Sequence, residues 1–120
     1  MPGGSEYQGP SKALARYRAA VEASSGDMAV RGAKNPYTSR NGHMFSFLDP
    51  EGSMALRLSD ELAEEFGDTH TTGPVIQYGR TMRGYVSVPE ELLADACTLA
   101  TWLDRAYDWI GTLPPKSTTR

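Results

Sequence analysis

Two apolar segments around a tight turn constrain the fold of this chain more than any other feature. Residues 43–48 (HMFSFL) and 53–58 (SMALRL) flank an Asp-Pro-Glu-Gly turn at 49–52, and proline and glycine at these positions are typical of a hairpin built on a type I turn. Pairing Phe47 with Met54 gathers both phenylalanines of the first segment on one apolar face. Because a shift of one residue would turn that face outward, we expect this register to hold.

Helical patterns stand on both sides of the hairpin. A first helix is expected over residues 11–25, with Ser11 as its N-cap. Ser59 is expected to cap a short acidic helix over residues 60–66. A last helix is expected to start at Asp95, which caps it. It carries an unbroken apolar stripe at helical spacing, formed by Leu99, Trp102, Leu103, Ala106, Tyr107 and Ile110.

The order of these elements predicts the fold class. Short strands are expected around residues 28–31, 75–78 and 84–88 in addition to the hairpin. The strands are bracketed by helices and show no regular alternation of strand and helix. We therefore expect an α+β domain in which an antiparallel sheet has the N- and C-terminal helices packed on one face.

Length and composition bound the class of protein. The 120 residues suffice for one domain, which we place at residues 11–111 between a disordered lead-in at 1–10 and a flexible tail at 112–120. Twelve Lys and Arg against fifteen Asp and Glu give a net charge of −3, which argues against direct nucleic-acid binding. The single cysteine, the lack of a secretory signal and the lack of a membrane-spanning stretch favour a cytoplasmic protein.

Motifs in the C-terminal half resemble those of a known family. The chain reads GRTMRGYVSVPEEL from residue 79, continues with a helix that contains Trp102, and reaches LPPK at 113–116. Together with the hairpin segments NGHMFSFL and ALRL, this pattern is similar to the TfoX-like (Sxy) N-terminal domain family over residues 10–116. The segment KNPYTSRNGHMF departs from the family's usual Met-Phe-Gly-Gly-x-Gly-Phe signature, as in a divergent single-domain member. The resemblance implies a TfoX N-terminal-domain-like fold and, because the family's competence regulators act through other proteins, a role in protein contacts.

Residue types that often carry chemistry form no known motif in this sequence. His43, His70 and Cys97 lack the spacing of metal ligands. The sequence also has no phosphate-binding loop, dinucleotide fingerprint or Gly-x-Ser-x-Gly elbow. We therefore expect no metal, no cofactor and no catalytic residues.

A polar patch is the best candidate site. Its members flank the hairpin and a later strand: Tyr37, Arg40, His43, Tyr78, Arg80 and Arg83. If the loops that carry them meet at one end of the sheet, they form a basic, hydrogen-bonding surface suited to an anionic ligand or an acidic partner. Alternatively, these arginines are separate and solvated, as exposed charges usually are.

Two functions from different classes fit these observations. The first is a small non-enzymatic interaction or regulatory module that binds a protein partner or a second copy of the chain. The alternative is a protein that binds a small anionic ligand, or an enzyme, and that uses the polar patch. A concave pocket lined by the patch would favour the alternative. No membrane contact is expected, and the net charge places nucleic-acid binding last.

Overall fold

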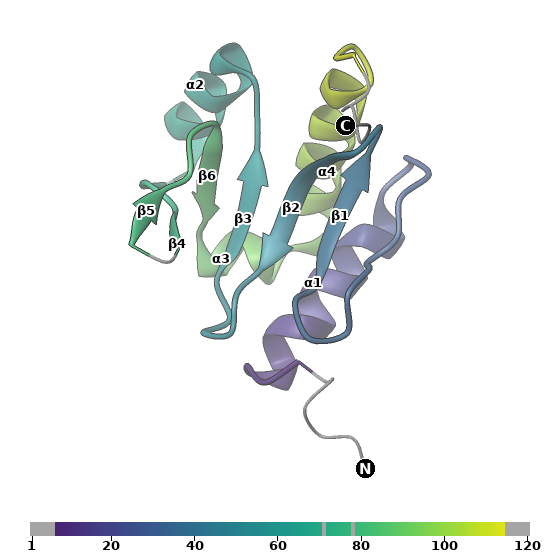
Figure 1. The fold of residues 1–120 in the computed structure, drawn as a ribbon, viewed down its shortest axis with the longest axis vertical. Helices are drawn as coiled ribbons and strands as arrows, with labels where there is room; N and C mark the ends of the chain where they lie inside the picture. The colour runs from purple at the N-terminus through teal and green to yellow at the C-terminus, as the bar shows by residue number, and fades with distance from the viewer. Residues whose placement is uncertain (1–6, 71, 78, 115–120) are drawn as a thin grey trace, which may run out of the picture.

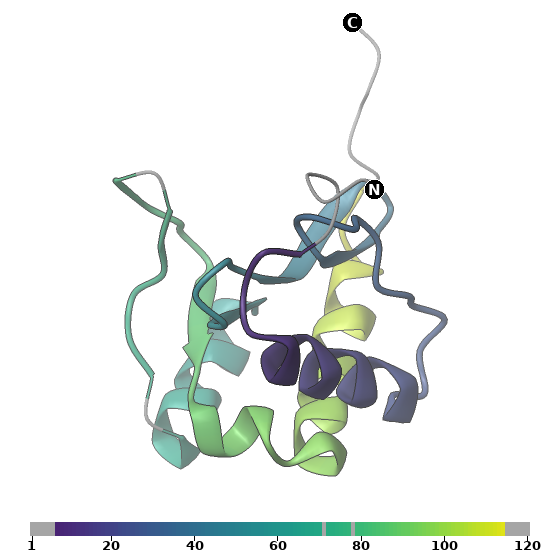
Figure 2. The same cartoon turned by 90° about the horizontal axis from the view of Figure 1, so that it is seen from below.

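A computed structural model describes residues 7–70, 72–77 and 79–114 of the chain. Within these residues the elements, in chain order, are α1 (Ser11–Ala23), β1 (Tyr37–Arg40), β2 (His43–Leu48), β3 (Met54–Arg57), α2 (Asp60–Thr69), β4 (Ile76–Gln77), β5 (Arg80–Thr81), β6 (Tyr85–Val88), α3 (Glu90–Leu93) and α4 (Ala96–Ile110). An antiparallel sheet has the strand order β1-β2-β3-β6, and β4 and β5 form a separate hairpin (Figure 1). Helices α1 and α4 pack on one face of the sheet (Figure 2), which confirms the predicted α+β fold.

The main core lies between this sheet and the helices. The apolar stripe of α4 faces it as predicted, with every member buried except the half-buried Tyr107. The end of α1 is tied to α4 through the Asp104 carboxylate, which accepts hydrogen bonds from the backbone N–H groups of Ser25 and Gly26. Across residues 7–70, 72–77 and 79–114, no helix combines the length and apolar character needed to cross a membrane.

A row of buried hydroxyl groups crosses this core. The hydroxyl oxygens of Tyr17 on α1 and Ser46 on β2 are 2.6 Å apart, and Ser46 also shares a hydrogen bond with the hydroxyl of Thr38 on β1. All three side chains are fully buried. Burial raises the pKa of the Tyr17 phenol well above its usual range, so Tyr17 stays protonated and able to donate. The row holds α1 in one position on the sheet. If α1 shifted, the Tyr17 hydroxyl would lose its hydrogen-bond partner in a core that water does not reach.

The predicted helix caps are confirmed at two of three positions. The Leu62 N–H donates to Ser59 Oγ at 3.2 Å, and Asp95 caps α4 by accepting from the Thr98 N–H. Ser11 was expected to cap α1 but is its first helical residue, since the N-cap is Pro10, which has no side-chain cap. Helices α1 and α2 end at Ala23 and Thr69 rather than at residues 25 and 66.

The cap of α2 makes a measurable contribution to stability. Replacing Ser59 with alanine is expected to lower the free energy of unfolding by about 1 kcal/mol, because the backbone N–H of Leu62 in the first turn of α2 loses its hydrogen-bond acceptor. Urea unfolding measures the change. Ser11→Ala is the matched control, since Ser11 makes no capping bond, and it should change stability by less than about 0.5 kcal/mol. Equal losses in both variants would contradict the assigned caps.

The predicted register of the hairpin is wrong by one residue. Phe47 pairs with Ala55 rather than with Met54. A separate irregularity of β2 is a β-bulge in its pairing with β1: Thr38 of β1 pairs with Ser46 while its neighbour Ser39 pairs with Met44, so Phe45 has no partner in β1. The extra residue resets the alternation of side chains along β2. Strict alternation, which the prediction assumed, therefore fails at this strand.

The bulge separates the two phenylalanines that were expected to share a face. Phe45 packs in the main core, where its ring lies edge-on to Tyr107 of α4. Phe47 packs on the opposite, outer face of the sheet. The register of the hairpin is set at the turn, where the Asp49 N–H donates to the Ser53 carbonyl at 2.9 Å, so that Asp49 rather than Leu48 lies opposite Ser53.

Other predicted boundaries change as well. No strand forms over residues 28–31; the structure has only a single bridge there, between Arg31 and Tyr37. The predicted strand at 75–78 is the two-residue β4, and Tyr78 lies outside the described residues. Residues 7–10, assigned to the lead-in, contact the domain, since the Tyr7 hydroxyl donates to the Asp49 carbonyl.

Candidate functional site

The outer face of the sheet, opposite α1 and α4, is covered only in part. The β4–β5 hairpin lies beside β6 (Figure 1), and Val75, just before β4, packs with Phe47 and Ala55 on this face of the sheet. The segment before the hairpin is held there by the Ser87 N–H, which donates to the Gly73 carbonyl at 3.3 Å, and by the Thr72 hydroxyl, which donates to the Ser87 carbonyl at 2.7 Å. The side chain of Val75 is buried against the sheet. The neighbouring surface over β1 and β2 has no such cover.

A cavity of about 690 Å³ occupies this neighbouring surface. We call it the outer groove. Its floor is apolar and consists of Tyr37, Met44 and Phe47, while residues 32–36 form one wall and residues 80–82 of β5 and the adjoining loop form the other. Its volume falls within the roughly 300–1,000 Å³ typical of ligand pockets.

The bulge in β2 builds the groove floor. Because Phe45 and Ser46 both face the helices, Met44 and Phe47 on either side of them both face outward. Tyr85 of β6 supports this arrangement: its hydroxyl donates to the Met44 carbonyl at 2.7 Å, and its ring lies 5.5 Å from that of Phe47. Burial raises the pKa of Tyr85, so the hydroxyl remains a donor. The floor is therefore held in place by hydrogen bonding as well as packing.

The wall at residues 32–36 depends on a glycine. Gly32 has φ = 81°, and a Cβ there would lie 2.5 Å from the Asn35 carbonyl oxygen, so only glycine fits the turn. Arg31 and Tyr37 exchange two backbone hydrogen bonds, of 2.8 and 2.9 Å, which close the loop against β1. The wall is thus anchored at both of its ends.

The charges at the groove are mostly basic. Lys34 on one wall and Arg80 on the other are exposed, and neither has a carboxylate partner within the described part of the chain. The carboxylate of Asp49, at the end of the groove, accepts hydrogen bonds from the backbone N–H groups of Glu51 and Ser53, both at 2.9 Å. The Asp49 carboxylate is therefore hydrogen-bonded within the turn. Among the described residues, Lys34 and Arg80 stand on the two walls without a carboxylate partner, on either side of the apolar floor.

Two of the six residues of the predicted patch lie at the outer groove, and two others serve a structural contact elsewhere. Tyr37 and Arg80 line the groove. Arg40 donates to the Tyr107 carbonyl at 2.8 Å and stacks on the Tyr107 ring with its guanidinium carbon 4.0 Å from the ring centre. His43 Nε2 donates to the Pro114 carbonyl at 2.7 Å. Arg40 and His43 thus fasten the β1–β2 turn to the end of α4.

Of the remaining two patch residues, Arg83 does not line the outer groove, and Tyr78 lies outside the described residues. Arg83 lines a separate cleft with Arg57 and Trp109, where β3 ends and β6 begins. The patch therefore does not form one surface among the residues that the structure describes. Tyr37 begins β1 and Arg40 ends it, which places them at opposite ends of the same strand.

The sequence pattern revealed neither the apolar floor nor the cation Lys34. Phe47 was expected to share the apolar face of the hairpin with Phe45, and the alternation of residues 43–48 carries no sign of the bulge that turns Phe47 outward. Lys34 sits in a polar loop whose only distinguishing feature is the following Asn-Pro pair. Only Gly32 and Pro36 could have indicated a rigid loop at this place.

The described groove offers contacts rather than reactive groups. It presents methionine and aromatic side chains, the Tyr37 hydroxyl, the Asn35 amide and the two cations. Across the described ranges, no group of three or more His, Cys, Asp and Glu side chains is placed to hold a metal ion. Cys97 is exposed on α4, away from the groove lining.

Fold and site define an α+β domain whose sheet has helices on one face and an apolar, basic-walled groove on the other. The model of the TfoX N-terminal domain family matches residues 38–110, which is more than half of the 120 residues. The chain therefore belongs to the TfoX N-terminal domain family. No curated protein and no solved structure matches it.

The matched range includes only part of the groove. It begins in β1 and ends at the last residue of α4. The floor residues Met44 and Phe47 and the wall at 80–82 lie inside it. The opposite wall, with Lys34, precedes it. Family membership thus covers most of the sheet and the floor residues Met44 and Phe47, whereas Tyr37 and the Lys34 wall precede the matched range.

Proposed function

We propose that the chain is a non-enzymatic interaction module that binds an extended segment of a partner protein in the outer groove. The observation that carries the proposal is the apolar floor between two cations that lack carboxylate partners in the described chain. The complementary segment presents apolar side chains flanked by Asp or Glu. The single free cysteine fits a reducing compartment, so the partner is expected in the cytoplasm.

The chemistry of the apolar side chains that line the outer groove supports a peptide as the occupant. Met44 and Met82 have flexible, polarisable side chains that adapt to different apolar partners, and Tyr37 adds a rigid ring with a hydroxyl at its tip. All three are only half-buried, so a bound segment would remove further apolar surface from water. Lys34 and Arg80 would orient the segment through its carboxylates and speed its association.

A small anionic ligand is the second candidate function. The concave shape and volume of the groove favour it, because a cavity of this size can enclose most of a small molecule. Arg80 and Tyr37 would then hold a carboxylate or phosphate group. The two candidates share the same residues and differ in the size of the occupant.

An NMR titration separates the two candidates. The probe is an N-acetylated, C-amidated hexapeptide of sequence Glu-Leu-Phe-Glu-Leu-Glu, added to the ¹⁵N-labelled chain, with octanoate in a parallel series. We expect the peptide to shift the backbone amides of residues 32–37, 44–48 and 80–82 and to bind more tightly than octanoate. The control peptide replaces each Glu by Lys and should bind more weakly.

Each other outcome identifies a different function. Octanoate binding at least as tightly to the same amides would favour the small ligand over the peptide segment. Shifts confined to residues outside the groove, or no shifts with either probe, would overturn the groove as the site. Concentration-dependent shifts of the groove amides without any probe, together with dimers in sedimentation, would make a second copy of the chain the occupant.

A further inference from the structure

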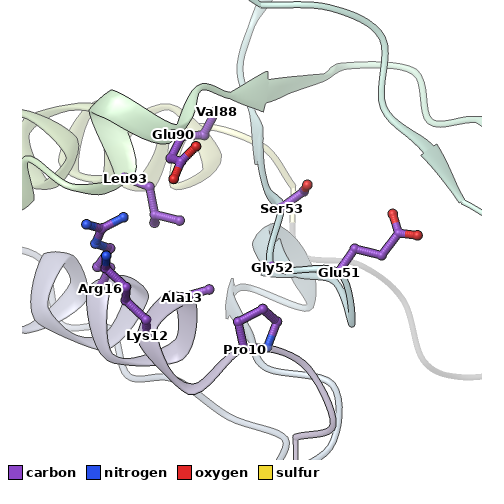
Figure 3. Close-up of a pocket in the computed structure, with 10 residues that line it drawn as sticks. All are labelled: Pro10, Lys12, Ala13, Arg16, Glu51, Gly52, Ser53, Val88, Glu90 and Leu93. Carbon is purple, nitrogen blue, oxygen red and sulfur yellow. The ribbon is translucent and has the colours of Figure 1, made fainter.

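A second cavity lies on the opposite side of the β2–β3 turn from the outer groove. It has a volume of about 290 Å³ and lies between the start of α1, the turn at residues 50–53 and the start of α3 (Figure 3). We call it the α1–α3 cleft. Its size is just below the roughly 300 Å³ at which drug-sized pockets begin, so its occupant would be a small metabolite rather than a nucleotide or peptide.

The inner wall of the α1–α3 cleft is apolar and rigid. Ala13, Val88 and Leu93 form it, and all three are buried. The turn approaches α1 closely at Gly52, where φ = 88° and a Cβ would lie 3.1 Å from Pro10 Cγ. A side chain at this position would therefore push the turn away from α1 and change the shape of the cleft.

Charges of both signs stand around this wall. Lys12 and Arg16, one turn apart on α1, extend toward Leu93, and the Glu90 carboxylate lies beside the same leucine (Figure 3). Among the residues that the structure places, neither cation forms an ion pair with Glu90 or with any other carboxylate. The Glu51 side chain extends away from them (Figure 3). The cleft thus holds two cations and one carboxylate that are separated by more than ion-pair distance.

This arrangement matches a ligand that carries both charges next to an apolar group. A carboxylate on the ligand would pair with Lys12 and Arg16, and an ammonium group with Glu90. An aliphatic side chain would then rest on Val88 and Leu93. A ligand with one charge only would leave one side of the cleft without a partner, or place like charges together.

We propose that the α1–α3 cleft binds a free α-amino acid with an aliphatic side chain. The site is separate from the outer groove, shares none of its lining residues, and does not depend on the function proposed for the groove. Because α1 supplies Lys12, Ala13 and Arg16 to the cleft and packs on α4, a bound amino acid would stabilise the position of α1.

The test uses L-leucine and two analogues that each lack one charge. 4-Methylpentanoate lacks the ammonium group and 3-methylbutylamine lacks the carboxylate. In an NMR titration of the full chain, leucine should shift the amides of residues 12–16, 51–53 and 90–93. Each analogue should bind at least tenfold more weakly than leucine, because one charge-assisted contact is lost.

Matched variants assign the two charges. Glu90→Gln should weaken leucine binding while leaving 4-methylpentanoate unaffected or better bound, and Arg16→Gln should weaken leucine while sparing 3-methylbutylamine. Glu91→Gln and Arg18→Gln are the controls, because both residues are exposed and outside the cleft lining. A dispersed NMR spectrum verifies that each variant is folded.

Three results would overturn the proposal. The first is leucine failing to shift the cleft amides at any concentration up to its solubility. The second is either analogue binding as tightly as leucine, which would remove the need for both charges. The third is a loss of leucine binding in Glu91→Gln or Arg18→Gln equal to that in Glu90→Gln or Arg16→Gln.

Discussion

Replacing Phe45 with alanine is expected to lower the free energy of unfolding by about 3–5 kcal/mol. Phe45 is fully buried between the sheet and α4, with its ring centre 6.0 Å from that of Tyr107. Its removal leaves a cavity in the main core that the rigid surroundings fill only in part. Urea unfolding followed by circular dichroism measures the loss.

Two further variants keep this prediction testable. A loss of this size is a large part of the roughly 5–15 kcal/mol by which most domains are stable, so Phe45→Leu provides a milder change that should still destabilise. Met44→Ala is the control on the other side of the bulge. Met44 is half-buried on the outer face, and its loss should cost less than half as much as that of Phe45. Equal costs for Met44→Ala and Phe45→Ala would contradict the placement of Phe45 in the main core and of Met44 on the outer face.

Ser46→Ala is expected to destabilise the domain by about 2–4 kcal/mol, more than Tyr17→Phe, for which about 1 kcal/mol or less is expected. Ser46 is the central member of the buried hydroxyl row, and its removal takes a hydrogen-bond partner from both the Tyr17 and the Thr38 hydroxyl. Removing the Tyr17 hydroxyl leaves Ser46 still bonded to Thr38. The order of the two effects therefore follows from how many buried groups lose their partner.

Urea unfolding of the two variants and of the double variant tests this order. In the double variant, the Tyr17→Phe change should recover part of the loss from Ser46→Ala, because it removes one of the two hydroxyls that lose a partner. A larger loss for Tyr17→Phe than for Ser46→Ala, or simple addition of the two losses, would show that the row does not act as a unit.

Local signals in the sequence were sufficient for much of the fold. The stripe of α4 is complete in the sequence, and the caps at Ser59 and Asp95 follow from residue types whose side chains bond to the helix start. The hairpin was also recognisable from its turn and its β-forming flanks. The register was not, because it depends on which residues close the turn, here Asp49 and Ser53. The bulge was not recognisable either, because it is an extra residue that only the pairing with β1 reveals. The order of apolar and polar residues in β2 alone is compatible with Phe47 on the helix-covered face or on the outer face of the sheet.

The candidate site depends on contacts that no local pattern contains. The walls of the outer groove come from residues 32–36 and 80–82, more than forty positions apart in the sequence. Tyr37 and Arg80 were identified as site residues, but Arg40 and His43 were grouped with them because all lie near strand ends. Which end of the strand each occupies, and that α4 ends beside Arg40, depends on the packing of the whole domain.

The most direct test of the central claim is a charge reversal at the two walls of the outer groove. Isothermal titration calorimetry compares the wild type with Lys34→Glu/Arg80→Glu, using the Glu-containing hexapeptide and its Lys-containing counterpart. Lys12→Glu/Arg18→Glu is the control, because it makes the same change in net charge outside the groove lining.

We expect the groove variant to bind the acidic hexapeptide at least about tenfold more weakly and to prefer the basic peptide, because two exposed charge contacts, each worth roughly 0.2–1 kcal/mol, turn from attractive to repulsive. The control should retain the wild-type preference. Equal weakening in the groove variant and the control would show that only net charge matters. Unchanged binding of the acidic hexapeptide by the groove variant would contradict the outer groove as the binding site.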